Sequence, residues 1–549
     1  MKLLIQKAIL ANILLFIGYS LSAGEIKIKI DKRYLNIPVS HKEDRHKMTF
    51  EVKGQPALSV VIRLAPDEAD YWVFKDVSNL KGKTLTISYK GNEKGLSNIY
   101  QDDNIKGEDN LYKENNRPQF HFTTKRGWIN DPNGLVYYDG EYHLFYQHNP
   151  FEREWENMHW GHAVSKDLVH WEELTDALYP DHLGGMFSGS AVIDYGNTAG
   201  YNKGDTPAMI VAYTAAGPDK QVQCIAYSLD KGRTFTKYTN NPVIDSKHIW
   251  NSHDTRDPKI FWYTSGNHWV MVLNERDGHS IYTSPDLKSW KYESHVTGFW
   301  ECPELFELAV DGNPNNKKWV MYGATGTYML GSFDGKTFIP ESGKYFYTKG
   351  SLYAGQTYTN IPNSDGRRIQ IAWGRISHPS MPFNGMMLLP TELTLHTTKE
   401  GIRLFSNPIK ETKQLFTPLK KWASLTSDKA NDHLKEFRNA ETLRIKTTFK
   451  LSHATSAGID LFGQRILDYD MNANTINSVF YSPEDRNSME LTADIYIDKT
   501  SIEVFIDGGI YSYSMGRKAA NNNQDGIRFW GNNIAVKNLE IFSVKSIWN

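Results

Sequence analysis

Apolar and polar residues alternate along much of this chain with the period of two that is typical of β-strands. The alternation is strict over 26–30 and 84–88, and a mainly apolar run covers 58–62, with charged turns between these segments. We therefore expect a small antiparallel β module over 25–110. Its last ten residues, 101–110, are polar and lack periodicity, so they are predicted to form a linker.

A repeat of Ser, then Asp, then an aromatic residue organises the region 115–408. The four copies begin at Ser165, Ser228, Ser284 and Ser332, so successive copies are 63, 56 and 48 residues apart. This spacing suits a four-stranded propeller blade with variable loops. Five apolar strands are expected among these copies, at 144–146, 209–213, 269–273, 318–322 and 369–373. They predict a five-bladed β-propeller, with one or two β-sandwiches as the alternative.

The remaining chain is also predicted to be β-rich. A segment with helical character, 409–415, leads to strand-like runs at 443–447, 494–497 and 501–506, the last followed by the turn Asp507-Gly508-Gly509. These runs fit a β-sandwich over 416–549. The expected fold class is therefore all-β: a five-bladed β-propeller followed by a C-terminal β-sandwich, with the small β module before them.

The N-terminal residues 1–23 have the pattern of a cleaved signal peptide. Lys2 and Lys7 precede a mainly apolar run over 8–18, and small residues follow it. The run is too short to span a bilayer as a helix, so we expect export to the periplasm or the medium and no membrane span; a buried N-terminal helix is the alternative. Only Cys224 and Cys302 occur, so the fold does not depend on a disulfide framework.

Charge and composition narrow the choice of partner. The chain has 62 basic and 63 acidic residues and a net charge of -1, which argues against nucleic acid as a partner. Aromatic residues make up 13% of the chain, and their flat apolar faces suit stacking on sugar rings.

Candidate catalytic residues lie in the segments that precede the apolar strands. These segments are 130–133, 187–190, 256–258, 301–303 and 353–356, and three of them carry an acid: Asp131, Asp257 or Glu301. If the first strand of every blade lines the axis, the three acids converge there. Clustered carboxylates repel and raise at least one pKa, so such clusters usually serve function or metal binding. Taken alone, the segment 128–134 also fits an ordinary hairpin turn.

Two of these acids suit the two roles of glycoside hydrolysis, in which one carboxyl group protonates the leaving oxygen and the other attacks carbon or activates water. Glu301 follows Phe299 and Trp300, so we expect an apolar setting that favours a proton donor. Asp131 has Asn130 and Asn133 beside it, and amides that donate hydrogen bonds to it would keep it ionised as the nucleophile.

Six ordered motifs together resemble glycoside hydrolase family 32, which contains invertases, inulinases, levanases and fructan β-fructosidases. They are W-I-N-D-P-N-G at 128–134, Y-Q-H-N-P at 146–150, M-H-W-G-H-A at 158–163, F-S-G-S at 187–190, R-D-P at 256–258 and E-C-P at 301–303. The resemblance covers about residues 115–549. It implies a retaining mechanism through a covalent fructosyl-enzyme, with Asp131 as nucleophile, Glu301 as acid/base and Asp257 as the acid that holds sugar hydroxyls and stabilises the transition state.

The same resemblance implies which residues contact the terminal fructose: Asn130, Gln147, Trp155, Phe187, Ser188, Arg256, Tyr353 and Trp373. Packing inside a blade is the alternative for Trp155, and a core position is the alternative for Tyr353 and Trp373. Glu156 and the pair Ser351-Leu352 depart from residues common in the family, which affects the expected subsites and not the chemistry.

The expected function is exo-acting release of fructose from levan, inulin and sucrose, because a funnel closed at its bottom admits one chain end. Endo-acting levanase activity is the first alternative, and an inverting arabinan-type propeller glycosidase or a non-catalytic fructan-binding protein follows. We expect no cofactor. We expect no metal either, because His148, His159 and His162 occur on strand-like segments without helical spacing.

Overall fold

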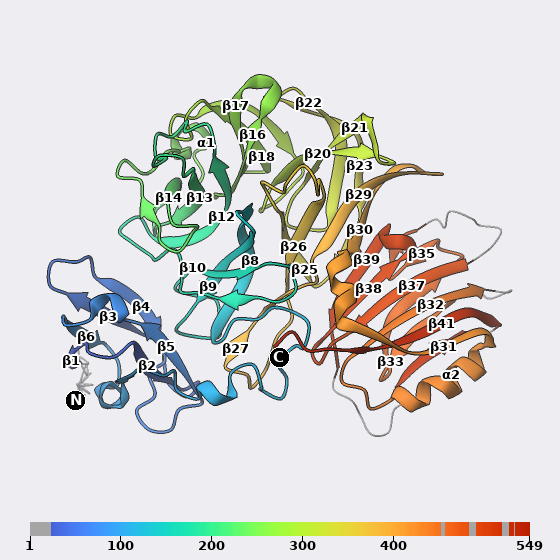
Figure 1. Ribbon diagram of the computed structural model, residues 1–549, viewed down its shortest axis with the longest axis horizontal. Helices are drawn as coiled ribbons and strands as arrows, with labels where there is room; N and C mark the ends of the chain where they lie inside the picture. Colours follow the sequence, from blue (N-terminus) through green and yellow to red (C-terminus); the bar gives the residue numbers. More distant parts are fainter. Residues whose placement is uncertain (1–23, 452–455, 482–489, 519–525, 532, 549) are drawn as a thin grey trace, which may run out of the picture. The chain divides into compact units, whose positions relative to one another are not determined.

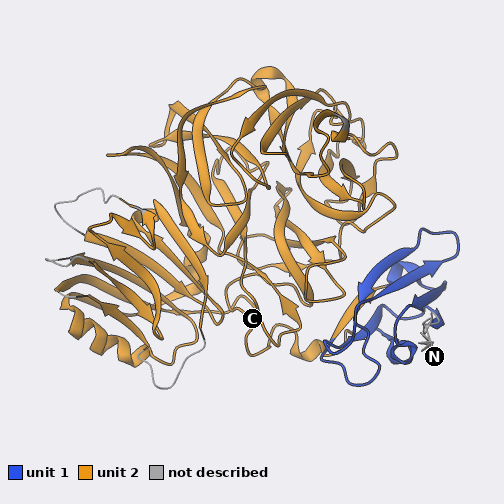
Figure 2. Cartoon of the chain, turned by 180° about the vertical axis from the view of Figure 1, so that it is seen from behind, with its two compact units in different colours: residues 1–71, 77–103 blue, residues 72–76, 104–549 orange. Residues whose placement is uncertain are grey.

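The computed structural model describes residues 24–451, 456–481, 490–518, 526–531 and 533–548, and the segment with the predicted signal peptide lies outside them. Two compact units divide the chain (Figure 2): residues 1–71 and 77–103 form one, and residues 72–76 and 104–549 form the other. Within the described part of the chain, no helix combines the length and the apolar character needed to cross a bilayer.

The first unit contains a four-stranded antiparallel sheet in the order β1-β6-β3-β4. The three strand-like runs of the sequence lie in β1, β4 and β6, as predicted. Its elements are β1 (Gly24–Lys29), β2 (Tyr34–Val39), β3 (His46–Val52), β4 (Leu58–Ile62), η1 (Ser78–Leu80), β6 (Thr84–Tyr89), η2 (Glu93–Asn98) and β7 (Tyr100–Asp102), and β5 covers Tyr71–Asp76. The expected linker is wrong at its start, because Gln101 and Asp102 belong to β7, which pairs with β2.

The second unit begins with five groups of four strands. Within each of the first four groups the strands are consecutive along the chain and pair antiparallel. These are β8 (Gly127–Tyr138), β9 (Glu141–Asn149), β10 (His159–Ser165), β11 (Glu172–Glu173); β12 (Gly185–Asp194), β13 (Ala208–Ala216), β14 (Gln221–Ser228), β15 (Thr236–Lys237); β16 (Thr255–Tyr263), β17 (His268–Glu275), β18 (Gly278–Ser284), β19 (Lys291–Thr297); and β20 (Glu304–Val310), β21 (Asn313–Tyr322), β22 (Thr327–Phe333), β23 (Phe338–Phe346). The short strand 383–384 also joins the first group in parallel, and the fourth and fifth groups belong to one nine-stranded sheet.

The fifth group consists of β25 (Leu352–Thr357), β26 (Arg368–Gly374), β29 (Thr391–Thr398) and β30 (Gly401–Pro408). Of the short elements, α1 (Lys247–Trp250) and β24 (Thr348–Gly350) lie between groups, η3 (Glu108–Asn110) precedes the first group, η4 (Thr264–Gly266) lies between β16 and β17, and β27 (Phe383–Asn384) and β28 (Met386–Met387) lie between β26 and β29. All five apolar runs expected from the sequence lie in the second strand of a group, namely β9, β13, β17, β21 and β26. In β9, β13 and β17 this strand is buried on both faces almost throughout, which explains its nearly continuous apolar pattern, whereas in β21 only the last three residues are buried.

The Ser-Asp repeat forms the turn between the third and fourth strands of a group. In three copies the Ser hydroxyl donates to the Asp carboxylate two residues later, at 3.1, 2.7 and 3.1 Å from Ser165, Ser228 and Ser284. The fourth Asp, Asp334, accepts hydrogen bonds from the amides of Lys336 and Thr337. The repeat is therefore a side-chain-closed turn, which stops one strand and starts the next.

The first strands of the five groups lie side by side around a common centre (Figure 1), with β8 against β12 and β25, and β12 against β16. Side-chain hydrogen bonds join them. Gln356 of β25 accepts from the Leu135 amide of β8 and donates to the Gly189 carbonyl of β12, and Ser190 of β12 donates to the Pro258 carbonyl of β16. These side-chain hydrogen bonds thus connect neighbouring groups, in addition to the backbone pairing within each sheet.

The C-terminal part follows η5 (Lys410–Leu415), which matches the predicted helical segment. Two sheets share one apolar core, which includes Ile445 and Leu539 from the first and Ile459 and Ile466 from the second. Their orders are β24-β39-β38-β37-β32-β41-β31 and β36-β35-β34-β33-β40. The elements are β31 (Phe416–Thr426), α2 (Ser427–Leu434), η6 (Lys435–Phe437), β32 (Leu443–Leu451), β33 (Ser456–Leu461), β34 (Gln464–Asp470), β35 (Thr475–Ile476), β36 (Val479–Phe480), β37 (Glu490–Ile497), β38 (Ser501–Ile506), η7 (Asp507–Gly509), β39 (Tyr511–Gly516), β40 (Ile527–Trp530) and β41 (Ile534–Val544).

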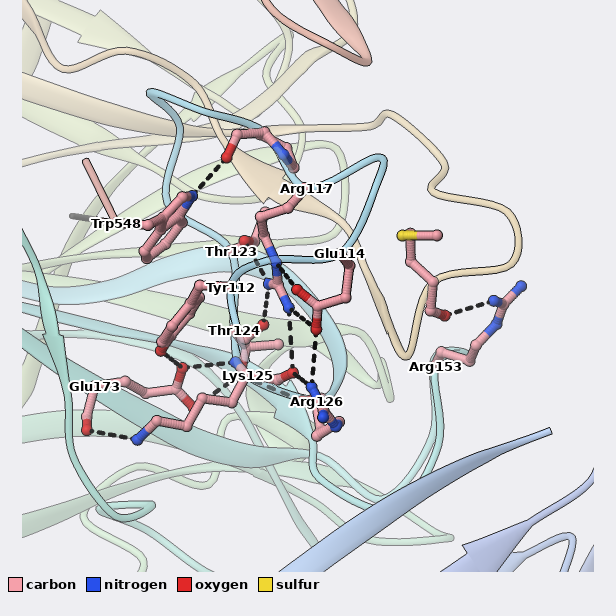
Figure 3. A network of polar contacts seen from close by, with 12 residues as sticks. Tyr112, Glu114, Arg117, Thr123, Thr124, Lys125, Arg126, Arg153, Glu173 and Trp548 are labelled. Carbon is pink, nitrogen blue, oxygen red and sulfur yellow. Dashed lines mark hydrogen bonds and ion pairs between the residues drawn. The ribbon is translucent and has the colours of Figure 1, made fainter. Parts of the chain in front are cut away.

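A polar network fixes the chain segment that leads into β8 (Figure 3). The guanidinium of Arg117, which is fully buried, donates to both oxygens of Glu114 at 2.8 and 2.9 Å and to the Thr123 hydroxyl at 2.8 Å. Near the C-terminus, the indole of Trp548 donates to the Pro118 carbonyl. Because these contacts hold the residues just before Gly127, they fix the point at which β8 enters its sheet.

Candidate active site

Irregular strand pairing places the candidate residues at the centre of the five groups. The register between the first and second strands shifts at Asn130-Asp131 in β8, at Ser188 in β12, at Asp257-Pro258 in β16 and at Ala354-Gly355 in β25. A β-bulge turns side chains out of the normal alternation. Four first strands thus present side chains towards the axis at the same level, near their starts.

The three acids meet around the thiol of Cys302. Its sulfur lies 3.6 Å from Asp131 Oδ2 and 3.6 Å from Asp257 Oδ2, and its backbone amide donates to Asp257 Oδ2 at 3.0 Å. Glu301 is the preceding residue. Asp257, Glu301 and Cys302 all have positive φ angles, of 65, 48 and 42°. Non-glycine residues in this region store strain, which is concentrated at functional sites.

Asp131 accepts side-chain hydrogen bonds from the Ser188 hydroxyl at 2.8 Å, from the Asn130 amide at 3.1 Å and from the Cys302 thiol at 3.6 Å. The expected donation from Asn133 is wrong. The amide of Asn133, oriented to satisfy its neighbours, donates instead to the Ser188 hydroxyl (3.2 Å) and accepts from Gln147 Nε2 (3.0 Å). Burial raises the pKa of Asp131, while Ser188 and Asn130 act in the opposite direction because they stabilise the ionised form.

Glu301 does not lie in the apolar setting that the neighbouring aromatic residues suggested. Arg256 donates to its Oε1 from Nη2 at 2.7 Å and from Nε at 3.1 Å, and the Tyr353 hydroxyl donates to its Oε2. The backbone amide of Glu301 donates to the side chain of Asn274 at 2.8 Å. The sequence could not indicate these contacts, because the partners come from other strand groups.

Asp257 is the most strongly perturbed acid of the cluster. Burial raises its pKa to about 7, with further contributions from the negative charges of Asp131 and Glu301, and the positive charge of Arg256 opposes the rise. Its side chain is buried, and its backbone amide donates to the Thr214 hydroxyl at 3.0 Å. The pKa of Asp257 in the free protein therefore lies well above that of an ordinary aspartate.

Aromatic side chains surround the acids. Trp155 is 50% exposed and packs edge to face on Phe187, with ring centroids 5.8 Å apart, so it is not part of a blade core. Trp373 contacts Trp128 at 5.8 Å and Tyr353 at 6.3 Å, and Tyr353 and Trp373 are both only partly buried. Such partly open aromatic faces can cover sugar rings.

Other candidates lie deeper. Gln147 is 2% exposed and donates to the Met186 carbonyl at 2.9 Å as well as to Asn133. Together with Asn133 and Ser188 it forms a chain of hydrogen bonds that ends on Asp131. Asn130 is buried, and its side-chain oxygen accepts from the indole of Trp128 at 2.8 Å.

A buried ion pair closes the axis below the acids. Lys259 Nζ lies 2.7 Å from Glu304 Oε1, and both side chains are almost completely buried, at 4 and 1% exposed. Lys259 also donates to the Thr357 carbonyl at 2.7 Å, and the Thr357 hydroxyl donates to Glu304 at 2.6 Å. The cavity between this pair and Asp257 has a volume of only about 10 Å³, which is room for one water molecule. A sugar chain therefore cannot pass through the centre.

Two residues at the centre, Cys302 and Asn274, were not singled out from the sequence. For Cys302, its position next to Glu301 was the feature of the sequence that could have indicated a place at the centre. Cys224 and Cys302 are both free, and Cys224 is buried in β14. Burial, followed by the charges of Asp257, Asp131 and Glu301, raises the pKa of the Cys302 thiol well above its usual range.

The three histidines considered for metal binding make other contacts. His148 pairs with Asp176 at 2.7 Å, His162 Nε2 lies 3.1 Å from His143 Nδ1, and His159 contacts the Asn157 carbonyl. Among the described residues, no group of three or more His, Cys, Asp or Glu side chains has the arrangement of a metal site.

Comparison with known proteins gives the family. The model of the N-terminal domain of glycosyl hydrolases family 32 matches residues 121–408, which include all three acids. The chain belongs to glycosyl hydrolase family 32.

Family-32 relatives cover most of the chain. A levanase of Bacillus subtilis is 38% identical over 490 residues, which are 80% of this chain and 72% of the levanase. An extracellular exo-inulinase of Aspergillus niger is 32% identical over 475 residues, 72% of this chain and 88% of the inulinase.

Solved family-32 structures have the same fold. The exo-inulinase of Aspergillus awamori superposes with a TM-score of 0.69 at 28% identity, over 80% of this chain and 100% of that one. A β-fructofuranosidase of Schwanniomyces occidentalis, in complex with fructosyl-erythritol, gives 0.67 at 27% identity, over 79 and 99% of the two chains.

Proposed function

We propose that this glycosidase releases terminal fructose from levan, inulin and sucrose, with retention of configuration. The observation that carries the proposal is the meeting of Asp131, Asp257 and Glu301, from three strand groups, above a sealed centre. The levanase, exo-inulinase and invertase names of its relatives support the substrate class. The sealed centre supports exo action, because a chain end can enter but a chain cannot thread through.

In this mechanism Asp131 attacks the anomeric carbon of the fructosyl unit while Glu301 protonates the leaving oxygen. A water molecule, deprotonated by Glu301, then cleaves the fructosyl–Asp131 bond. The hydrogen bonds from Ser188 and Asn130 support Asp131 as the nucleophile, because they stabilise its carboxylate. We expect Asp131 and Glu301 carboxyl groups about 5–5.5 Å apart in the sugar complex, as retention requires.

Asp257 and Arg256 would hold the fructosyl ring. Sugar hydroxyls that donate to Asp257 would favour its ionised form and lower its pKa from about 7. In the free site the guanidinium of Arg256 donates to Glu301. A sugar that accepts some of the hydrogen bonds of Arg256 would therefore release Glu301 for proton transfer. Trp155, Phe187, Ser188, Asn130, Tyr353 and Trp373 are the proposed further contacts, and Gln147 would act on the sugar mainly by positioning.

The proposed architecture has four parts: a signal peptide at 1–23, a β module at 25–110, a five-bladed propeller at 115–408 and a β-sandwich at 416–549. The five strand groups around one centre support the propeller, and the two sheets on one apolar core support the sandwich. Secretion is proposed from the pattern of residues 1–23, and the exo-inulinase relatives named extracellular are consistent with it.

Substitution of the two acids tests the mechanism. Asp131→Ala and Glu301→Ala should each abolish turnover of levan, inulin and sucrose while the protein stays folded by circular dichroism. With a fructoside whose leaving group departs without a proton, azide should restore cleavage to Glu301→Ala, because a small anion can attack the fructosyl-enzyme without a general base. Normal hydrolysis by Asp131→Asn, together with no azide rescue of Glu301→Ala, would reverse the assignment.

Product sizing tests the mode of attack. Exo action predicts free fructose as the first product from levan and inulin, whereas oligosaccharides that appear before fructose would indicate an endo-acting levanase. The anomeric form of the first product, followed by NMR, separates retention from inversion, and inversion would favour the arabinan-type alternative. An inactive wild type that still binds fructan would favour a binding protein.

A further inference from the structure

A large cavity lies at the other end of the first strands. It has a volume of about 930 Å³, within the range of roughly 300–1,000 Å³ that is usual for ligand sites. In β16, Asp257 lies near the start and Trp262, which lines this cavity, near the end. Trp262 is five positions after Asp257 along the strand, or about 16 Å at about 3.3 Å per residue. The buried Lys259 lines both this cavity and the small one below the acids, so the ion pair with Glu304 divides them.

The lining of this far-end cavity combines open aromatic faces with neutral polar groups. Trp262 is 36% exposed and Tyr195 is 64% exposed. Asn360 donates to the Tyr195 hydroxyl at 3.1 Å, and the exposed Asn363 and Ser265 also line the cavity. Amides and hydroxyls both donate and accept hydrogen bonds, and indole and phenol rings offer flat apolar surfaces. This is the chemistry that recognises sugar rings.

The charges of the far-end cavity are balanced. Lys259 and Arg368 are its cationic lining residues, and Asp194 and Glu307 are its acidic ones. Lys259 is paired with Glu304, and Glu307 pairs with Lys317 at 2.8 Å. Asp194 accepts from the amides of Thr198 and Ala199. A polyanion would find no surplus of positive charge here, so the lining favours an uncharged ligand.

We propose that the far-end cavity is a second carbohydrate-binding site, which takes a short stretch of a fructan chain and does not cleave it. The identity of the sugar rests on the proposed function, whereas the existence of the site rests on the cavity itself. Because the axis is sealed, a chain held here is a different segment or a different molecule from the one at the acids. A polymer held at one end of the propeller presents its other chain ends to the active site at a raised local concentration.

Affinity electrophoresis in native gels that contain levan or inulin tests this site. The inactive Glu301→Gln protein serves as the background, and Trp262→Ala or Tyr292→Ala is added to it. Tyr292 is a matched control, because it is 37% exposed, packs edge to face on Tyr282 and lies on β19, outside the far-end cavity. In the active background, kcat/KM is measured for sucrose and for levan with the same two substitutions.

We expect Trp262→Ala to weaken retention by levan or inulin about three- to tenfold, the size of effect for a lost aromatic stacking contact. Cleavage of sucrose should be unchanged, and kcat/KM for the polymer should fall by a similar factor. Tyr292→Ala should change neither. Equal retention of the Trp262→Ala and Tyr292→Ala proteins would overturn the second site while leaving the proposed function intact. Failure of the wild type to cleave any fructan would instead overturn the proposed function, and retention lost with Trp262→Ala would still support the site.

Discussion

Replacing Asp257 by Asn should stabilise the protein while removing its activity. Asp257 is 6% exposed, and burial together with two neighbouring acids raises its pKa to about 7. Asn has nearly the same shape, and its side-chain oxygen can still accept the hydrogen bond from the Cys302 amide at 3.0 Å. The substitution therefore removes a buried charge without opening a cavity.

The size and sign of the effect follow from proton linkage. The ordinary pKa of Asp257 is 3.8, so the folded protein binds this proton more tightly than the unfolded chain does. Wild-type stability therefore falls as the pH rises from about 4 to about 7. The full difference corresponds to about 4 kcal/mol at about 1.4 kcal/mol per pKa unit, which is an upper bound because Asp131 and Glu301 share the repulsion. We expect Asp257→Asn to recover about 1–3 kcal/mol at pH 8 and nothing near pH 4.

Thermal unfolding of wild type and variant between pH 4 and pH 8.5 measures this difference. In a chain of 549 residues a gain of this size corresponds to a rise in Tm of about 1–3 °C at pH 8. Asp334→Asn is the control, and its effect on Tm should have the opposite sign. Backbone amides of Thr337 and Lys336 lower the pKa of Asp334 and so favour its ionised form, which the substitution removes. A Tm difference between Asp257→Asn and wild type that stays constant with pH, or that is negative at pH 8, would refute the reasoning.

Three further substitutions test the surroundings of the acids. Lys259→Met leaves Glu304 buried without its partner and should lower the free energy of unfolding, measured in urea, by about 3–5 kcal/mol. The double variant Lys259→Met/Glu304→Leu should recover most of this loss. A Lys259→Met protein as stable as wild type would contradict this. Ser188→Ala removes a hydrogen bond that lowers the pKa of Asp131, so the acidic limb of the kcat/KM profile should move to higher pH, and an unmoved limb would speak against Asp131 as the ionised nucleophile. Trp155→Ala should raise KM for fructan about three- to tenfold with little change in kcat, and an unchanged KM would remove Trp155 from the sugar contacts.

Much of the fold could be predicted from local patterns in the sequence. The apolar run 209–213 predicted β13, which is buried on both faces. The repeat at Ser165, Ser228 and Ser284 predicted the spacing of the strand groups, because a turn closed by neighbouring side chains is encoded within a few residues. Strands with a less regular pattern, such as β2 and β7 of the first unit, were not distinguished.

The acids could be identified from the sequence, but their environments could not. The adjacent residues suggested that Asn133 keeps Asp131 ionised and that Phe299 and Trp300 surround Glu301. In the structure, Ser188 bonds Asp131, and Arg256 and Tyr353 bond Glu301. Adjacent residues of a strand point to its opposite faces. Which side chains reach the axis is decided by the β-bulges, where the register between the first and second strands shifts.

The sequence by itself therefore determined the three acids proposed for catalysis, the strands near them and the turns between those strands, since each depends on a few consecutive residues. The tertiary structure alone decided the raised pKa of Asp257, the sealed centre at Lys259 and Glu304, and the far-end cavity. These depend on how much water is excluded and on which charges approach one another when separate strand groups close around an axis, and no local stretch of sequence contains that information.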